Sequence, residues 1–283
     1  MTIGEILREG IEYLEKNNIS EKNVKARILL AFALNKSKEY LVTNNDKEIE
    51  ENSKKLYMSY IKELAEGKPL QHITKKQEFM KMDFLVNEDV LIPRPDTEIL
   101  VEEVISIAGG IKKPVILDLC TGSGAIAVAI AKNIEDSDIT ASDISNKAIE
   151  IAKLNASNNE TNEQIRFVES DLFNNIGESS KFDIIVCNPP YIKRNELANL
   201  DKEVQAESQI ALDGGADGLA FYKKIVEKAT KYLNKNGYLC FEIGYDQKNE
   251  VIEIIKKNGK YENLYSKKDL GDNDRIIICQ LNH

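Results

Sequence analysis

One stretch of the chain, residues 115–130, restricts the possible folds more than any other. Val115 to Leu119 is a short apolar run of strand type, Cys120 to Gly124 is a glycine-rich turn, and Ala125 to Ile130 has the composition of a buried helix. A strand that leads through such a turn into a helix begins a β-α-β unit, and these units build parallel sheets. The glycines allow backbone N–H groups to approach a ligand closely, and the helix amino terminus adds partial positive charge. The stretch therefore predicts an α/β domain with a ligand site at this turn.

The rest of the chain extends the same alternation of strands and helices. Seven strand candidates follow residue 110, namely 114–119, 138–142, 165–169, 182–187, 237–243, 261–266 and 274–280. Because helical patterns separate most of them, we expect a seven-stranded, doubly wound, Rossmann-like sheet.

The first part of the chain has a different pattern. Apolar residues recur at helical spacing in Ile3 to Lys16 and Glu21 to Leu34, and shorter helix candidates cover Lys38 to Val42 and Glu48 to Glu66. Between Gln77 and Ile92 the apolar residues alternate as in a β-hairpin. We therefore expect a small all-helical N-terminal domain for substrate recognition at 1–75, a β-hairpin linker at 76–95 and a catalytic domain at 96–283.

Two acids stand at the ends of the first two strands of the sheet. Asp143 closes the second strand, where a carboxylate can hold both hydroxyls of a ribose, as in sites for NAD or for S-adenosylmethionine. Asp118 precedes the glycines, where it would meet a ligand ammonium and repel a pyrophosphate, so an amino-acid-bearing nucleoside fits better. The structural alternatives are that Asp118 caps the turn that follows it and that Asp143 caps a helix over Lys147 to Asn155.

The tetrad Asn188-Pro189-Pro190-Tyr191 follows the apolar run Phe182 to Cys187, at the carboxyl end of a buried strand. The prolines remove two backbone donors and keep the turn from becoming helical, so its carbonyls stay available. The Asn188 oxygen and the Pro189 carbonyl can accept both hydrogens of a planar NH2 group while the Tyr191 ring packs against it. The tetrad thus favours modification of an amide or exocyclic amine, although the same residues also occur in ordinary turns.

In order along the chain, these motifs resemble the PrmC/HemK family, the release factor protein-(glutamine-N5) methyltransferases. The resemblance covers nearly the whole length. The matching stretches are Gly67 to Ile73 with Glu78-Phe79, Ile92 to Glu98, Asp118 to Gly124, Ser170 to Phe173, Asn188 to Tyr191, Leu212 to Leu219, Glu242 to Gly244 and Asp269 to Arg275. Asn-Pro-Pro-Tyr also occurs in DNA and RNA amine methyltransferases, so the Pro93 to Glu98 segment and the amino-terminal block carry the narrower assignment.

The resemblance implies methyl transfer from S-adenosylmethionine to the side-chain amide of the glutamine in the Gly-Gly-Gln motif of peptide chain release factors, leaving S-adenosylhomocysteine. It implies that the last strand, Arg275 to Leu281, is inserted antiparallel. The expected catalytic residues are Asn188, Pro189, Pro190 and Tyr191. The expected cofactor-binding residues are Asp118, Thr121, Gly122, Ser123, Gly124, Asp143, Asp171, Leu172, Phe173 and Asn188, with Arg94 and Thr97 closing the methionine end. Glu242 is close in topology but is equally typical of a structural acid at a strand end.

Two departures from the family concern the cofactor. Cys120 replaces the usual glycine, and its small side chain should still fit beside the cofactor methionine. Leu172 replaces an aromatic residue of many relatives, so apolar packing on the adenine is kept and ring stacking is lost. We expect little effect from Cys120 and weaker cofactor affinity from Leu172.

Composition limits the other functions. The formal net charge is −9, which argues against an enzyme that must neutralise many DNA phosphates, and we expect no direct nucleic-acid binding. The four cysteines have no CxxC spacing and only two histidines are present, so neither a disulfide framework nor a metal site is indicated. The sequence has no signal-type or membrane-length apolar run, which predicts a cytoplasmic protein without membrane contact. The sequence does not give the oligomeric state, and a monomer is the default expectation.

Three alternatives remain open at this point. A glutamine methyltransferase of a ribosomal protein would share the tetrad and differ in its substrate. An RNA or DNA amine methyltransferase would also share it but would need basic surface or a target-recognition insertion. A binding module without activity would keep the cofactor and catalyse no transfer.

Overall fold

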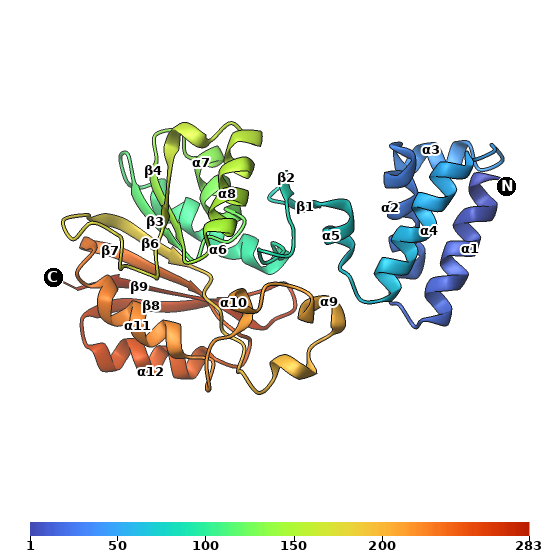
Figure 1. Ribbon diagram of the computed structural model, residues 1–283. Helices are drawn as coiled ribbons and strands as arrows, with labels where there is room; N and C mark the ends of the chain where they lie inside the picture. Colours follow the sequence, from blue (N-terminus) through green and yellow to red (C-terminus); the bar gives the residue numbers. More distant parts are fainter. Residues whose placement is uncertain (283) are drawn as a thin grey trace. The chain divides into compact units, whose positions relative to one another are not determined.

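The computed structural model describes residues 1–282 and divides into two compact units. The first contains residues 1–75 together with the short segment 201–206, and the second contains 76–200 and the described residues from 207 onward. The segment 201–206 includes the single-turn helix α9 (Lys202–Gln205), and the Lys25 ammonium forms an ion pair with Glu203 at 2.5 Å. Figure 1 shows the elements of both units.

The first unit is entirely helical. Its helices are α1 (Ile3–Lys16), α2 (Lys22–Leu34), α3 (Lys38–Thr43), α4 (Glu51–Ala65) and α5 (Leu70–Thr74). The Thr2 hydroxyl and the Glu5 carboxylate form a reciprocal capping box at the start of α1, and Gly10 gives room for the buried Tyr57 of α4. The predicted helices are confirmed, except that α4 begins three residues later than expected and α5 was not predicted.

The expected hairpin is present but shorter. It consists of β1 (Lys76–Phe79) and β2 (Met82–Leu85), which pair antiparallel, and residues 86–94 contain no strand. The hairpin ends at Leu85 because the Asn155 side chain takes over both backbone groups of that residue, accepting from its N–H at 2.7 Å and donating to its carbonyl at 3.0 Å. The hairpin groups with the second unit.

The second unit is built on a seven-stranded sheet of order β5-β4-β3-β6-β7-β9-β8. Its strands are β3 (Val115–Leu119), β4 (Asp138–Asp143), β5 (Ile165–Glu169), β6 (Phe182–Cys187), β7 (Leu233–Glu242), β8 (Tyr261–Lys268) and β9 (Asp274–Leu281). All neighbours from β5 to β7 pair parallel, and β9 is inserted antiparallel between β7 and β8. The predicted doubly wound sheet and its antiparallel last strand are confirmed.

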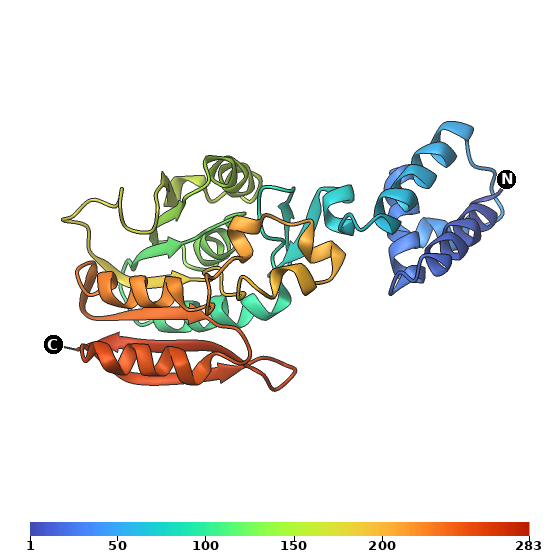
Figure 2. The same cartoon turned by 60° about the horizontal axis from the view of Figure 1, so that its bottom comes forward.

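Helices cover both faces of this sheet (Figure 2). The core of one face is formed with α6 (Pro95–Ala108), α7 (Ala125–Asn133) and α8 (Asn146–Asn158), and that of the other with α11 (Ala220–Ala229) and α12 (Lys248–Asn258). Short turns complete the fold: α10 (Gln209–Leu212), η1 (Asn162–Gln164) and η2 (Leu197–Asn199). No helix among residues 1–282 has the length and apolar character needed to cross a bilayer.

Candidate active site

The glycine-rich turn joins β3 to α7 at the carboxyl edge of the sheet. Cys120, Gly122 and Gly124 all have a positive φ, between 54° and 80°. A Cβ on Gly124 would lie 3.0 Å from the Ala152 side chain, whereas one on Gly122 would meet nothing within 4 Å. Gly124 is therefore needed for the close packing of α7 on α8, and Gly122 is needed only for its backbone conformation.

Asp143 lies at the end of β4 and is held by two backbone donors. Its Oδ2 accepts from the Gly122 N–H and its Oδ1 from the Ser145 N–H, each at 2.9 Å. Half-burial raises the pKa of the carboxyl, which these two bonds partly offset. Helix α8 is capped by the Ser145 hydroxyl, which accepts from the Ala148 N–H, so Asp143 is not its N-cap. Each Asp143 oxygen keeps acceptor capacity for a ligand hydroxyl.

Asp118 is completely buried below the same turn. Its Oδ2 accepts from the Thr121 hydroxyl at 2.5 Å, and a further bond comes from the Ala127 backbone N–H. Its Oδ1 has no hydrogen-bond partner within the described chain. Burial raises the pKa of Asp118 to about 7. Asp118 thus does bond the turn that follows it, as the structural alternative expected, and still has a free acceptor oxygen.

A cavity of ≈ 290 Å³ opens beside these residues, within the second unit. The predicted site residues that line it are Gly122, Asp143, Asp171, Leu172, Asn188 and Pro190. Further lining residues were not predicted, among them Val90, Leu91, Ile144, Ile210, Phe221 and Lys224. The alternation of apolar walls with carboxylates at two strand ends suits a nucleoside, which has a flat ring and a polar sugar. The apolar lining comes from separate loops, which single motifs could not show.

Several expected cofactor contacts lie elsewhere. Phe173 is 2 % exposed, packs in the core and stacks on Tyr232 with 4.7 Å between ring centroids. Thr121, Ser123 and Gly124 are buried in the turn and do not line the cavity. The Arg94 guanidinium pairs with the buried Glu207, whose other oxygen accepts from the Ile92 N–H. Of this set, the structure brings none to the cavity wall.

The Asn188 to Tyr191 tetrad leaves β6 beside the cavity, and a second loop braces it. The Ile192 N–H donates to the Leu212 carbonyl at 3.0 Å, and the Gly214 N–H donates to the Ile192 carbonyl at 2.8 Å. A Cβ on Gly214 would lie 2.7 Å from the Tyr191 backbone, so only glycine permits this approach. The motif over Leu212 to Leu219 therefore supports the tetrad and fixes its path.

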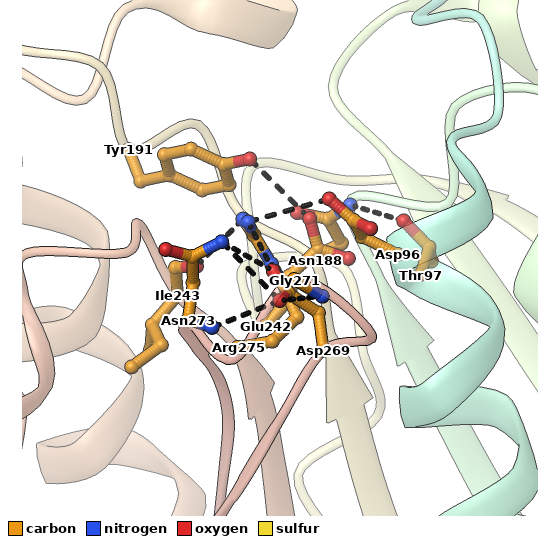
Figure 3. A network of polar contacts seen from close by, with 10 residues as sticks. All are labelled: Asp96, Thr97, Asn188, Tyr191, Glu242, Ile243, Asp269, Gly271, Asn273 and Arg275. Atoms are coloured by element: carbon orange, nitrogen blue, oxygen red, sulfur yellow. Dashed lines mark hydrogen bonds and ion pairs between the residues drawn. The ribbon is translucent and has the colours of Figure 1, made fainter.

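The side chains of Asn188 and Tyr191 point toward a polar network (Figure 3). The Asn188 Nδ2 donates to the Thr97 hydroxyl at 3.4 Å, and the Tyr191 hydroxyl donates to Glu242 Oε1 at 3.3 Å. Thr97 stands next to Asn188 and does not line the cavity, which differs from its expected place at the methionine end of the cofactor. Burial raises the pKa of Tyr191 well above its ordinary value.

Arg275 of β9 organises the outer part of this network. Its guanidinium pairs with Asp269 at 2.9 Å and with Asp96 at 3.3 Å, and donates to the Ile243 carbonyl at 3.4 Å. Asp269 also accepts from the backbone N–H groups of Gly271 and Asn273, each at 2.9 Å. The antiparallel last strand therefore ties the ends of β7 and α6 together. The Ile92 to Glu98 and Asp269 to Arg275 stretches match the family in sequence, but the sequence alone did not indicate that their side chains form this network.

The sheet order, the glycine-rich turn and the tetrad at the end of β6 together define a Rossmann-like methyltransferase. Residues 95–217 match the family model described as Methyltransferase small domain, and residues 5–74 match the PrmC N-terminal domain. The chain is 40% identical over 281 residues to the release factor glutamine methyltransferase of Clostridium acetobutylicum, which covers 99% of this chain and 98% of that relative. The Fusobacterium nucleatum protein of the same name is also 40% identical, over 98% of this chain and 78% of its own length. The chain belongs to the release factor glutamine methyltransferase family.

Solved structures support the fold. The ribosomal protein L11 methylase of Lactobacillus delbrueckii superposes with a TM-score of 0.51 at 20% identity, covering 70% of this chain and 84% of the other. A methyltransferase from Pyrococcus furiosus superposes with a TM-score of 0.53 at 19% sequence identity, covering 72% of this chain and 91% of the other. At these identities the likeness describes the shared sheet and helices.

Proposed function

We propose that this chain transfers a methyl group from S-adenosylmethionine to the side-chain amide nitrogen (N5) of the glutamine in the Gly-Gly-Gln motif of peptide chain release factors, in support of translation termination. The observation that carries the proposal is the placement of Asn188, which lines the same cavity as Asp143 and has its NH2 end held by Thr97. The name of the full-length relatives supports the choice of substrate.

The residues present fit S-adenosylmethionine. Asp143, which lines the cavity, would hold the ribose hydroxyls. Asp118 does not line the cavity and is fully buried below the turn, where its free Oδ1 is an acceptor suited to the ammonium of the methionine part. Leu172 would pack on the adenine and Asp171 would lie near its amino group. The cofactor, when bound, supplies a methyl group activated by a sulfonium. The apolar walls would keep water from that group.

The protein must align an amide nitrogen whose lone pair is delocalised into the carbonyl. We infer that the Asn188 Oδ1 and the Pro189 carbonyl accept the two N–H bonds of the substrate amide. These hydrogen bonds strengthen as the C–N bond forms, the C–S bond breaks and positive charge grows on nitrogen. Tyr191 would pack on the amide plane. The nitrogen would then lose one proton to solvent water, so that the products would be the N-methyl amide and S-adenosylhomocysteine.

Methyl-labelled S-adenosylmethionine tests the proposal directly. The purified chain is incubated with a bacterial release factor and, separately, with a copy in which the Gly-Gly-Gln glutamine is replaced by alanine. We expect label in the intact factor alone. Label in neither factor, with transfer to ribosomal protein or RNA instead, would keep the methyl-transfer chemistry and reject the substrate. Cofactor binding without transfer to any acceptor would reject the enzyme assignment.

A further inference from the structure

Gln247 has a buried side-chain amide that the proposed transfer does not use. It is the N-cap residue of α12. Its Nε2 donates to the Tyr191 carbonyl at 2.9 Å and to the Gly218 carbonyl at 3.3 Å. Its Oε1 accepts from the Gly244 N–H at 3.0 Å. One side chain therefore joins three backbone segments: the tetrad, the loop 212–219 that braces it and the turn that follows β7.

The partners of this amide determine its orientation. A backbone N–H can only donate and a backbone carbonyl can only accept, so the Gly244 N–H requires the oxygen end and the two carbonyls require the NH2 end. The Tyr222 hydroxyl lies 3.4 Å from the same oxygen. Both NH2 protons and the oxygen are thus engaged in a single orientation of the side chain.

Two glycines allow the amide to reach these groups. A Cβ on Gly218 would lie 2.5 Å from the Tyr191 carbonyl oxygen and 2.6 Å from the Gln247 Nε2. A Cβ on Gly244 would lie 2.8 Å from the Gln247 Oε1. Real Cβ atoms do not come this close to other heavy atoms, so both positions exclude a side chain. The backbone around Tyr191 is therefore shaped to receive a primary amide.

The tetrad needs such support because its own backbone makes few hydrogen bonds. Pro189 and Pro190 have no N–H, so neither can donate to a neighbouring segment. Beyond them, the Ile192 N–H and carbonyl bond the loop 212–219 at 3.0 and 2.8 Å, and the Tyr191 carbonyl bonds Gln247. These bonds fix the direction in which the chain leaves the two prolines, and with it the position of the Pro189 carbonyl.

We propose that Gln247 is a positioning residue for the methyl acceptor, which through the Tyr191 carbonyl holds the tetrad in the conformation needed for transfer. The proposal rests on the proposed function of the tetrad in amide methylation. Gln247 does not line the cavity, so it acts on turnover and leaves cofactor binding unchanged. A displacement of about 1 Å at a reacting group can cost about 100-fold in rate, so a residue that touches no reacting atom can still have a large effect.

Kinetics of matched variants test this role. Gln247→Met keeps the length of the side chain and removes its hydrogen bonds. We expect kcat to fall at least about tenfold, while calorimetry shows an unchanged Kd for S-adenosylmethionine and an unchanged number of binding sites per chain. A fall of kcat that only follows a loss of binding sites would indicate general unfolding and would overturn the positioning role.

Gln164→Met is the control for that experiment. The Gln164 amide likewise donates to a backbone carbonyl, that of Ala131 at 3.2 Å, and accepts from the Ser137 hydroxyl at 3.1 Å. It lies at the amino end of β5, whereas the cavity lies at the carboxyl ends of the strands. The variant removes similar hydrogen bonds and should keep the wild-type kcat. An equal fall of kcat in both variants would reject a specific role for Gln247.

Hydrogen exchange gives a readout that needs no methyl acceptor. In Gln247→Met the backbone amides of Ile192 and Gly214 should exchange faster than in the wild type, because their bonds depend on the path of the tetrad. The Gly122 amide, which donates to Asp143, should exchange at the wild-type rate.

Unchanged exchange at Ile192 and Gly214, or a wild-type kcat in Gln247→Met, would each overturn the positioning role. If the wild-type chain labels no release factor but the exchange of these two amides rises in the variant as expected, only the proposed substrate fails.

Discussion

The two sides of the cavity are built by different means. On the cofactor side, at β3 and β4, the key carboxylate is fixed by the backbone: Asp143 is held by the N–H groups of Gly122 and Ser145. On the acceptor side, at β6 and β7, Asn188 and Tyr191 are fixed by the side chains of Thr97 and Glu242. In the first arrangement the bonded residues are 21 and 2 positions apart in the sequence, whereas in the second they are 91 and 51 positions apart.

This difference corresponds to what each side must do. A ribose needs a stationary acceptor, which the backbone of a strand end provides regardless of neighbouring side chains. An amide acceptor must be bound in one orientation, and an asparagine amide can reverse unless its NH2 end is engaged. The cofactor side is therefore expected to tolerate changes around its carboxylate, whereas the acceptor side should respond to changes several bonds away from the substrate.

The largest effect should follow Asn188→Ala. Because the aligned acceptor is lost only where charge develops in the transition state, we expect turnover to fall by at least about 100-fold. The affinity for S-adenosylmethionine should change little, since the cofactor side remains intact. Rates with saturating cofactor and calorimetric titration separate the two quantities. Asn162→Ala, at an exposed position in η1, is the control. Near-normal turnover of Asn188→Ala would remove the tetrad from the reaction.

Asp143→Ala should weaken cofactor binding and leave turnover largely unchanged, which is the reverse of the effect expected for Asn188→Ala. Loss of hydrogen bonds between a carboxylate and the ribose costs about 1.5–3 kcal/mol, so the Kd for the cofactor should rise roughly 10- to 100-fold while kcat at saturation is mostly retained. Asp138→Ala changes an exposed acid at the other end of the same strand and should have no effect on binding. An unchanged affinity of Asp143→Ala by calorimetry would show that the ribose site is misplaced.

The same contrast explains how much the sequence could predict. The turn at Cys120 to Gly124 and the acid at Asp143 follow from adjacent strand, turn and helix patterns, and the structure brings Gly122 and Asp143 together at the cavity. The seven strands were likewise predicted from the alternation of strand and helix patterns, whereas the antiparallel insertion of the last strand was implied by the family resemblance and not by periodicity. Local patterns are sufficient where a feature is formed by neighbours in sequence.

The acceptor network was not predictable by the same reasoning. Thr97 was expected beside the cofactor and instead meets Asn188, and Phe173 was expected against the adenine and instead stacks on Tyr232. In both cases the residue lies in the right motif, but the direction of its side chain depends on packing between distant elements. Leu172 itself has a φ of +50°, and this turn of the backbone directs the Leu172 side chain to the cavity and leaves Phe173 in the core. Sequence periodicity does not contain that information.

The Asp118→Asn variant tests the effect of this buried carboxyl on the free energy of unfolding and on its pH dependence. Burial raises the pKa of Asp118 from its ordinary value near 3.8 to about 7, so the folded chain binds a proton between these values that the unfolded chain does not. Stability from this group is therefore present at low pH and is lost as the pH rises toward 7, by roughly 1 kcal/mol per pH unit. Urea unfolding at pH 5 and pH 7.5 should show that the variant loses less stability over this interval than the wild type. Equal losses would place the titration elsewhere.

Cys120→Gly should have the smallest effect and tests how rigidly the backbone of the cofactor side is built. Cys120 has a φ of +58°, a conformation that costs a non-glycine residue roughly 1–2 kcal/mol, although glycine recovers part of this through the greater entropy of the unfolded chain. We expect a gain of about 1 kcal/mol or less in the free energy of unfolding.

Gly122→Ala provides the reverse change at a φ of +54°, where the added Cβ meets no atom within 4 Å, so its loss of stability measures the backbone cost alone. If urea unfolding shows a gain in the free energy of unfolding for Cys120→Gly and a loss for Gly122→Ala, backbone conformation decides stability in this turn. A loss in both variants would mean that the Cys120 side chain contributes more through its apolar contacts than its backbone costs.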